Sequence, residues 1–281
     1  MATILEDTIA TIADILGSEL DTITIERAVI GLFFTGVKLS AGTAGTCATP
    51  RDAIPDGVCC PFSAPAVPFP GKLKGRPARE IAADALNPDG IRRAVGIATV
   101  NALAELCWQR RPCGDVALLP GTDAFDATEF RPGDRTVLVG AFIPFLKELK
   151  RRRLPYLVLE QNKAALKAEE LPFYRPAETA GAVVPTADVL LITGTTLLND
   201  TLEDLLALAR PAARVTIVGP TVGMLPDAFL ARGADILGSV RIKEPDAFLE
   251  LLGEGGAAPH FLCRSVEKIV LARRHIAAKV A

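Results

Sequence analysis

The stretch ADVLLITGTTLLNDTLEDLLALA, residues 187–209, decides the fold class. It begins with a short and almost unbroken apolar run, passes through a turn rich in threonine and glycine, and ends with leucines at helical spacing. A buried strand that leads directly into a helix is the repeating unit of parallel sheets, because parallel strands need a crossover connection. The stretch therefore predicts one strand–turn–helix unit of an α/β protein.

The same unit recurs on both sides of this stretch, from Arg135 onward. Four further apolar runs predict strands: TVLVGAF (136–142), PYLVLEQ (155–161), RVTIVGP (214–220) and DILGSVRI (235–242). Helical patterns lie between these runs and after the last one. Since right-handed crossovers return each strand to the same sheet, the alternation predicts a doubly wound, Rossmann-like parallel sheet with helices on both faces.

The first half of the chain has a different pattern. Residues 21–40, DTITIERAVIGLFFTGVKLS, alternate and are rich in β-branched and aromatic residues, which predicts two strands paired as a hairpin. An amphipathic helix is predicted before them, and two more helices over residues 78–86 and 89–109. Residues 41–77 are rich in Gly, Pro, Ser and Ala and predict a long loop. This half is therefore expected to be α+β.

The predicted domain boundary follows from a cluster of turn-forming residues over positions 112–132. We expect an α+β domain over residues 1–115 and a Rossmann-like α/β domain over residues 116–281. A ligand site is expected in the cleft where the two halves meet.

Composition limits the partners that this chain can have. The formal net charge of −2 over 281 residues provides no basic field for nucleic acid, so a small molecule or a metal ion is the expected partner. No apolar run reaches the roughly 18 residues of a membrane span, and the acidic start does not resemble a signal peptide. The six scattered cysteines are expected to be reduced thiols, which indicates a cytoplasmic protein.

Candidate site residues follow from a rule of open parallel sheets, in which ligands bind beyond the carboxyl ends of the strands. Polar residues and glycines follow four of the predicted strands: Gly140 after the first, Glu160 after the second, Thr193, Gly194, Thr195, Asn199 and Thr201 around the third, and Gly219, Pro220 and Thr221 after the fourth. We expect these residues to lie near one edge of the sheet.

Two readings stay open for the most polar of these positions. Glu160 lies 20 positions after Gly140, where an acid accepts hydrogen bonds from a ribose, or it is a solvated charge at a strand end. The segment 193–201 binds an anionic or polar ligand, or supplies Asn199 or Asp200 as the cap of the next helix, and the two roles are compatible with each other. The first turn lacks the G-x-G-x-x-G pattern, which disfavours conventional dinucleotide binding.

Cys47 is the candidate metal ligand, because its Gly- and Thr-rich surroundings could bring the thiol to the cleft. Thiolates select soft or borderline ions, so a transition metal is the candidate cofactor. The alternative is an ordinary buried thiol. The chain contains no G-x-S-x-G, P-loop or H-E-x-x-H motif, which leaves the usual hydrolase, NTPase and zincin classes without support.

The chain also resembles a known family. The segments 187–209 and VTIVGPTVGMLPDAFLARGADILGS (215–239) resemble the C-terminal domain of the heavy-metal chelation family, and VIGLFFTGVKLS (29–40) and GIATVNALAE (96–105) resemble its N-terminal domain. The resemblance implies an enolase-N-like α+β domain packed on a Rossmann-like domain, with a site in the cleft between them.

By position, the resemblance implies a set of site residues: Asn101, Gly140, Thr193, Gly194, Thr195, Asn199, Thr201, Gly219, Pro220 and Thr221. Asp200 departs from the pattern, because the family often has glycine there.

Three functions remain open on the sequence. The first is binding or processing of a heavy metal or a metal-chelating small molecule in the cleft. The second is an enzyme acting on a nucleotide-like or pterin-like organic ligand without metal. The third is a non-catalytic interaction protein, a homo-oligomer for example, that uses the Pro-rich loop 61–70 as its contact surface.

Overall fold

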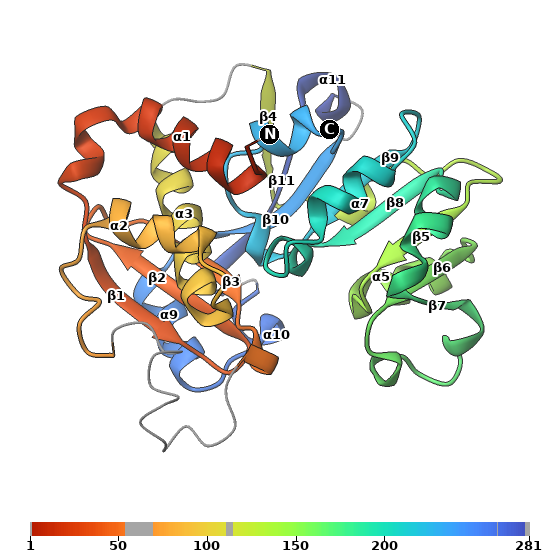
Figure 1. Ribbon diagram of the computed structural model, residues 1–281, viewed down its shortest axis with the longest axis horizontal. Helices are drawn as coiled ribbons and strands as arrows, with labels where there is room; N and C mark the ends of the chain where they lie inside the picture. The colour runs from red at the N-terminus through yellow and green to blue at the C-terminus, as the bar shows by residue number, and fades with distance from the viewer. Residues whose placement is uncertain (1, 54–69, 111–114, 263, 279–281) are drawn as a thin grey trace.

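The molecule is built on two β-sheets, which a computed structural model describes for residues 2–53, 70–110, 115–262 and 264–278. The smaller sheet has three antiparallel strands in the order β1-β2-β3. The larger has eight strands in the order β4-β11-β10-β9-β8-β5-β6-β7 and lies beside the small sheet in Figure 1. The predicted α/β class, with an α+β first part followed by a mostly parallel sheet, is confirmed.

Six neighbouring strands of the large sheet run parallel: β5 (Thr136–Val139), β6 (Tyr156–Glu160), β7 (Tyr174–Pro176), β8 (Val189–Thr193), β9 (Arg214–Val218) and β10 (Ile236–Ile242). The chain builds outward from β5 to β7 and then crosses back to build from β8 to β10. Strand order therefore reverses between β5 and β8, as it does between the two βαβαβ halves of a doubly wound sheet.

Two antiparallel strands complete one edge of this sheet. They are β11 (Val266–Arg273), which pairs with β10, and β4 (Val116–Pro120), which pairs with β11. The sequence did not predict either strand. The β4 strand falls inside the turn-rich region 112–132, where the glycines and prolines on both sides hide a five-residue strand.

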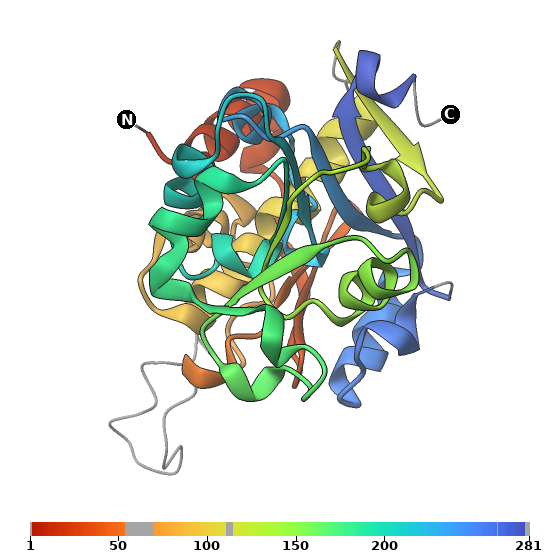
Figure 2. The same ribbon diagram turned by 90° about the vertical axis from the view of Figure 1, so that its right-hand side faces the viewer.

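Helices cover both faces of the large sheet (Figure 2). On one face, α5 (Ile143–Arg151) buries three apolar side chains against alternate strand residues such as Leu138. On the other face, α7 (Leu202–Leu208) and α8 (Asp227–Ala231) pack on the core that contains Val137. Strands with apolar side chains on both faces explain the nearly continuous apolar runs of the sequence.

The first part of the chain supplies α1 (Ile4–Leu16), the hairpin of β1 (Ile25–Ile30) and β2 (Phe34–Leu39), strand β3 (Ala44–Ala48), α2 (Ala78–Ala83) and α3 (Gly90–Arg110). The predicted helices and hairpin are confirmed. The described helices include none that is long and apolar enough to cross a membrane.

Strand β3 corrects the prediction that residues 41–77 form a loop throughout. Its residues are small because α3 packs directly on the strand. A Cβ atom on Gly45 would lie 2.2 Å from the carbonyl oxygen of Ala98 and 2.3 Å from the amide nitrogen of Ala102. The glycine and other small residues that suggested a turn are thus required by the close contact between β3 and α3.

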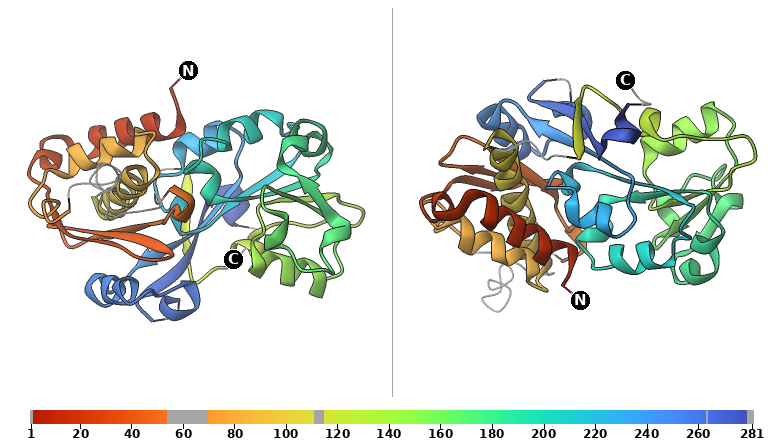
Figure 3. Two further views of the ribbon diagram at one scale, coloured as in Figure 1. Left: turned by 60° about the horizontal axis from the view of Figure 1, so that its bottom comes forward. Right: turned by 90° about the horizontal axis from the view of Figure 1, so that it is seen from above.

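The small sheet lies between two helices that are far apart in the sequence (Figure 3). One of its faces packs on α3, and the other on α9 (Pro245–Gly253), which follows β10. A Cβ atom on Gly36 would lie 2.6 Å from a side-chain methyl of Leu249, so α9 fits closely on β2. The C-terminal part of the chain therefore completes the core of the N-terminal part.

Candidate functional site

A cavity of about 520 Å³ opens at the carboxyl ends of β5, β6 and β8, where strand order reverses. We call it the switch-point pocket. Six of the predicted site residues line it: Gly140, Glu160, Thr193, Thr195, Asn199 and Thr201. Its full lining comes from residues 139–208, which belong to the large sheet and its connections.

Gly140 allows the strands to approach each other at the base of the pocket. Its φ of 88° lies in the left-handed region that favours glycine. A Cβ atom at this position would lie 2.5 Å from the Cγ2 methyl of Thr193 on the neighbouring strand. A larger residue would therefore push the end of β8 away from β5.

Glu160 is fixed by two backbone groups. Its Oε2 atom accepts a hydrogen bond of 2.6 Å from the Ala141 N–H, and its Oε1 atom accepts one of 2.9 Å from the Asn162 N–H. Each carboxylate oxygen can accept a further hydrogen bond. The carboxylate thus ties the β5–α5 turn to the end of β6 and still lines the pocket.

The segment 193–201 forms the hydroxyl-rich side of the pocket. Thr196 Oγ1 donates to the Thr193 carbonyl at 2.7 Å, and the hydroxyls of Thr193 and Thr195 lie 3.2 Å apart. The Thr201 hydroxyl donates to Asn199 Oδ1 at 2.7 Å. Helix α7 has Thr201 at its N-cap without a side-chain cap bond, so the alternative in which Asn199 or Asp200 caps this helix is wrong.

Asp200 adopts a backbone conformation that usually requires glycine. Its φ is 59°, and aspartate is one of the few other residues that tolerate the left-handed region. Arg93 of α3, whose side chain is 7% exposed, compensates by pairing with both carboxylate oxygens of Asp200, at 2.8 Å for Nη1 to Oδ2. It also donates to the Leu197 carbonyl at 3.1 Å. Helix α3 thereby holds the pocket segment in place.

Gly194 is buried and does not line the pocket; a Cβ atom there would lie 3.1 Å from a side-chain methyl of Val222. The remaining predicted residues lie at a contact between β3, α3 and the 3₁₀ turn η10 (Pro220–Val222). We call this contact the seam; it contains the buried residues Cys47, Asn101 and Thr221 and the half-buried residues Gly219 and Pro220. The Asn101 side-chain amide donates to the carbonyls of Thr46 at 2.7 Å and Thr221 at 2.9 Å. The Thr221 hydroxyl accepts from the Ala48 N–H at 3.1 Å. These bonds join the small sheet to the large one.

Cys47 is fully buried in the seam. Burial raises the pKa of its thiol to about 12, although a hydrogen bond to Thr221 and the charge of Arg93 act in the opposite direction. The neutral thiol is therefore the form present at neutral pH, whereas the thiolate is the form that binds metals. Among the described residues, no three His, Cys, Asp or Glu side chains converge as a metal site.

Sequence reasoning missed three charged residues near the pocket. Glu178 and Asp204 line it, and Arg93 supports it from α3. The two acids lie on connections rather than at strand ends, where the strand-end rule does not apply. Arg93 is 107 positions from Asp200, and nothing local in the sequence signals that pairing.

The two sheets and the pocket at the reversal of strand order define a two-part α/β protein with a cavity at the carboxyl ends of its parallel strands. Two family models match the chain, one over residues 13–104 and one over residues 123–271, and both carry the description "Putative heavy-metal chelation". The chain belongs to this family, and the resemblance predicted from the sequence is confirmed.

Similar proteins are known from two archaea and a bacterium. Over 166 residues the chain is 30% identical to an uncharacterized protein of Methanocaldococcus jannaschii, a match that covers 57% of this chain and 59% of that relative. Two solved structures of DUF364-family proteins of unknown function share the fold. The Pyrococcus horikoshii protein gives a TM-score of 0.72 at 17% identity, covering 95% of this chain and 99% of that chain. The Desulfitobacterium hafniense protein gives 0.68 at 16% identity, covering 94% and 100%.

Proposed function

We propose that this protein binds a metal-chelating small organic molecule, alone or as its metal complex, in the switch-point pocket. In this proposal the ligand's own donor atoms hold the metal, and the protein recognises the oxygens and nitrogens of the chelator. The family description, which concerns heavy-metal chelation, supports the link to metals.

The observation that carries the proposal is the lining of the pocket. Hydroxyls from the 193–201 segment, the Asn199 amide and the Glu160 carboxylate converge on one cavity from two strand ends, those of β8 and β6. Such groups form directional hydrogen bonds with a polar ligand, and the cavity volume of about 520 Å³ lies in the range of small-molecule sites. Leu159, Leu205 and Leu208 add apolar contact area.

Cys47 takes part in this proposal as a metal ligand only under one condition. As a metal ligand it would need the seam to open, because its thiol is buried beside Thr221 and its pKa is raised. A transition metal delivered by the chelator would be the ion that such a thiol selects.

A second candidate is an enzyme that acts on a nucleotide-like or pterin-like ligand without metal. The position of Glu160 favours this candidate. Glu160 lies at the end of β6, the strand that follows β5 in the chain and pairs with it. An acid at this position binds ribose hydroxyls in dinucleotide-binding sheets. Against it, the Ala141 N–H, which could otherwise meet a phosphate, donates to Glu160.

The remaining predictions stay part of the proposal. They are a domain boundary near residue 115 and a cytoplasmic location, which agrees with the absence of a disulfide at Cys47 and Cys107. The third alternative, a non-catalytic oligomer that uses the loop 61–70, falls on residues of which 61–69 lie outside the described part of the chain.

Native mass spectrometry combined with elemental analysis tests the proposal on protein purified without chelators or a metal-affinity tag. We expect a bound organic mass with stoichiometric metal in the wild type and in Cys47→Ser, and its loss in Ala180→Phe, which fills the pocket. An organic mass without metal would favour the second candidate if the released molecule binds no metal. A wild-type chain with no bound mass, or loss of the mass only in Cys47→Ser, would contradict the proposal.

A further inference from the structure

A second cavity, of about 160 Å³, lies at the carboxyl end of β9 and along β10. Phe145 and Val218, which line it, belong to the core on the α5 side of the large sheet. Val139 and Leu205 of the switch-point pocket belong to the core on the α7 side. The two cavities share no lining residue and are therefore separate sites.

Four phenylalanine rings characterise this second cavity, which we call the aromatic cavity: Phe34, Phe142, Phe145 and Phe261. Phe142 and Phe145, at the start of α5, meet edge to face with ring centroids 5.0 Å apart. Phe34 of β2 and Phe261 of α10 (Ala258–Phe261) form a second edge-to-face pair at 5.3 Å. The rings thus come from both the small-sheet and the large-sheet parts of the molecule.

The floor of the cavity is apolar. A Cβ atom on Gly238 of β10 would lie 2.2 Å from the Cβ of Ala124. Glycine therefore leaves room for helix α4 (Ala124–Ala127) to pack directly on this strand. The neighbouring Ser239 hydroxyl donates to the Gly219 carbonyl at 3.1 Å. Among the described residues of the floor, the Ser239 hydroxyl is therefore already used as a donor and does not favour a strongly polar occupant.

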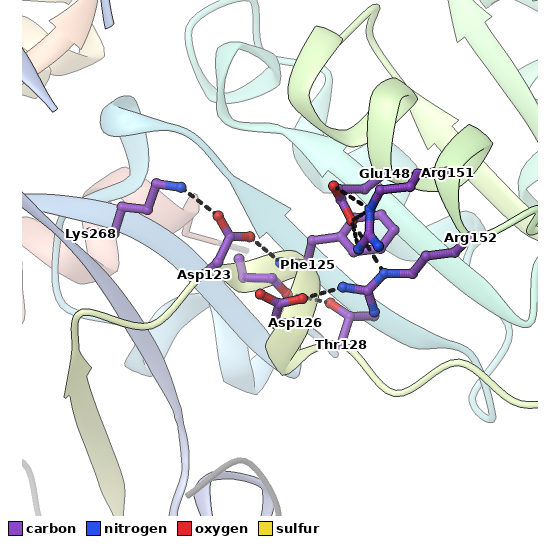
Figure 4. Close-up of polar contacts among 9 residues, drawn as sticks. Asp123, Phe125, Asp126, Thr128, Glu148, Arg151, Arg152 and Lys268 are labelled. Carbon is purple, nitrogen blue, oxygen red and sulfur yellow. Dashed lines mark hydrogen bonds and ion pairs between the residues drawn. The ribbon is translucent and has the colours of Figure 1, made fainter. Parts of the chain in front are cut away.

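The rim carries one ion pair, shown in Figure 4. Asp123 accepts a hydrogen bond of 2.9 Å from the Phe125 N–H and pairs with Lys268 at 2.6 Å. Both charged side chains remain partly exposed, at 35% and 45%. A polar substituent at the mouth of the cavity would meet both a carboxylate and an ammonium group.

The wall that carries Asp123 is held in place by α5. Arg152, at the end of that helix, pairs with Asp126 and Glu148 and lies 4.8 Å above the Phe125 ring (Figure 4). The Thr128 hydroxyl donates to the Ala124 carbonyl at 2.7 Å. The cavity is thus bounded by a fixed segment, and a ligand would enter without ordering it first.

We propose that the aromatic cavity binds a small molecule with a single aromatic ring and a hydroxyl substituent directed at Asp123 and Lys268. An apolar cavity of about 150 Å³ is large enough for benzene. Rings that already meet edge to face offer the same geometry to a fifth ring. The hydroxyl can donate to the carboxylate or accept from the ammonium group. This inference does not rest on the proposed function of the switch-point pocket.

Fluorine NMR titration with 4-fluorophenol tests the proposal. The two comparison ligands are fluorobenzene, titrated in the same way, and cyclohexanol, which has no fluorine and is measured by its displacement of 4-fluorophenol. Ala258→Phe fills the aromatic cavity, and Ala180→Phe is the matched control, because each alanine is the first residue of a four-residue helix and lines one of the two cavities. We expect saturable binding to the wild type and to Ala180→Phe, at least tenfold weaker binding to Ala258→Phe, and weaker binding of both comparison ligands. In Lys268→Met the preference for 4-fluorophenol over fluorobenzene should fall.

A measurement on the wild type alone locates the ligand independently of the variants. Nuclear Overhauser contacts from the ring protons to Val218 and Ile269 methyls are expected. Contacts to Leu205 instead would place the ligand in the switch-point pocket and overturn the proposal. Absence of saturable binding, unchanged binding in Ala258→Phe, or equal binding of cyclohexanol would overturn it as well.

Discussion

The segment 193–201 and the seam contain residues of the same family pattern, yet they differ in almost every physical respect. Thr195 and Thr201 line an open pocket, and each of their hydroxyls bonds to a side chain two positions earlier, that of Thr193 and that of Asn199. Asn101 and Thr221 are 4% and 1% exposed and bond across the junction of the two sheets. The first region has polar groups with capacity for a ligand, whereas the second uses its polar groups to hold the molecule together.

This difference shows that a shared motif does not define a shared role. A buried amide that satisfies two carbonyls is required by the fold, because an unpaired buried carbonyl costs free energy. A hydroxyl on an open pocket costs little when it is removed from the unliganded protein. Substitutions in the seam should therefore mainly lower the stability of the protein, whereas substitutions in the segment 193–201 should mainly weaken ligand binding.

The largest expected effect is that of Gly45→Ala on the β3–α3 contact beside the seam. The added methyl would meet the backbone of α3 at 2.2 Å, and backbone atoms in a packed helix have little room to move. We expect a loss of about 3 kcal/mol or more in the free energy of unfolding, measured by urea denaturation. Gly181→Ala, where a Cβ atom would meet nothing within 4 Å, is the control and should change it by less than about 0.5 kcal/mol. Equal effects at both positions would show that the contact is not tight.

Asn101→Ala should destabilise the protein by about 2–3 kcal/mol, because it leaves the buried carbonyls of Thr46 and Thr221 without their donor. Asn199→Ala removes one exposed hydrogen bond from Thr201 and should cost less than about 0.5 kcal/mol. Chemical denaturation of the two variants measures the difference directly. If Asn199→Ala cost as much as Asn101→Ala, the division into pocket and seam would fail.

Asp200 joins the segment 193–201 to Arg93 of α3, and its two simplest substitutions separate backbone strain from ion pairing. Both Asp200→Ala and Asp200→Gly remove the pair with Arg93, but glycine accepts a φ of 59° without strain. We expect Asp200→Gly to be more stable than Asp200→Ala by about 1 kcal/mol. Thermal and urea unfolding of both variants give this difference. The opposite order would mean that the loop changes conformation when the pair is lost.

Cys47 should make the stability of the protein depend on pH in the alkaline range. Its folded pKa of about 12 lies above the ordinary thiol value of 9.0, because burial disfavours the thiolate. The neutral thiol therefore contributes stability in full below pH 9, and this contribution is lost as the pH rises from about 9 towards 12.

The matching measurement compares the wild type with Cys47→Ala by urea denaturation from pH 7 to 10. At pH 10 the wild type should have lost about 1 kcal/mol more than the variant, relative to their values at pH 7. Identical pH profiles would show that the thiol is not buried in solution.

The sequence predicted the elements whose patterns are local. Apolar runs identified β5, β6, β8, β9 and β10, and because parallel strands share one carboxyl edge, the rule for strand ends placed Gly140, Glu160 and Thr193 near one another. It failed for β3, where small residues reflect contact with α3, and for β4, which is surrounded by turn residues. Contacts between distant residues decide both cases.

The division of the site residues could not be read from the sequence for the same reason. Thr195 and Thr221 both follow apolar strands and both carry hydroxyls, but α3 and β3 cover the second and not the first. The role of Arg93 depends on a residue in the other half of the chain. Burial and partners at long range are properties of the packed molecule.

The most direct test of this account measures ligand occupancy and stability in the same two variants, Asn199→Ala and Asn101→Ala, by native mass spectrometry and urea denaturation. The account predicts that Asn199→Ala keeps the stability of the wild type and loses the bound mass, whereas Asn101→Ala is destabilised and its folded fraction keeps the mass. Loss of the bound mass in folded Asn101→Ala, with retention in Asn199→Ala, would contradict it and place the ligand at the seam.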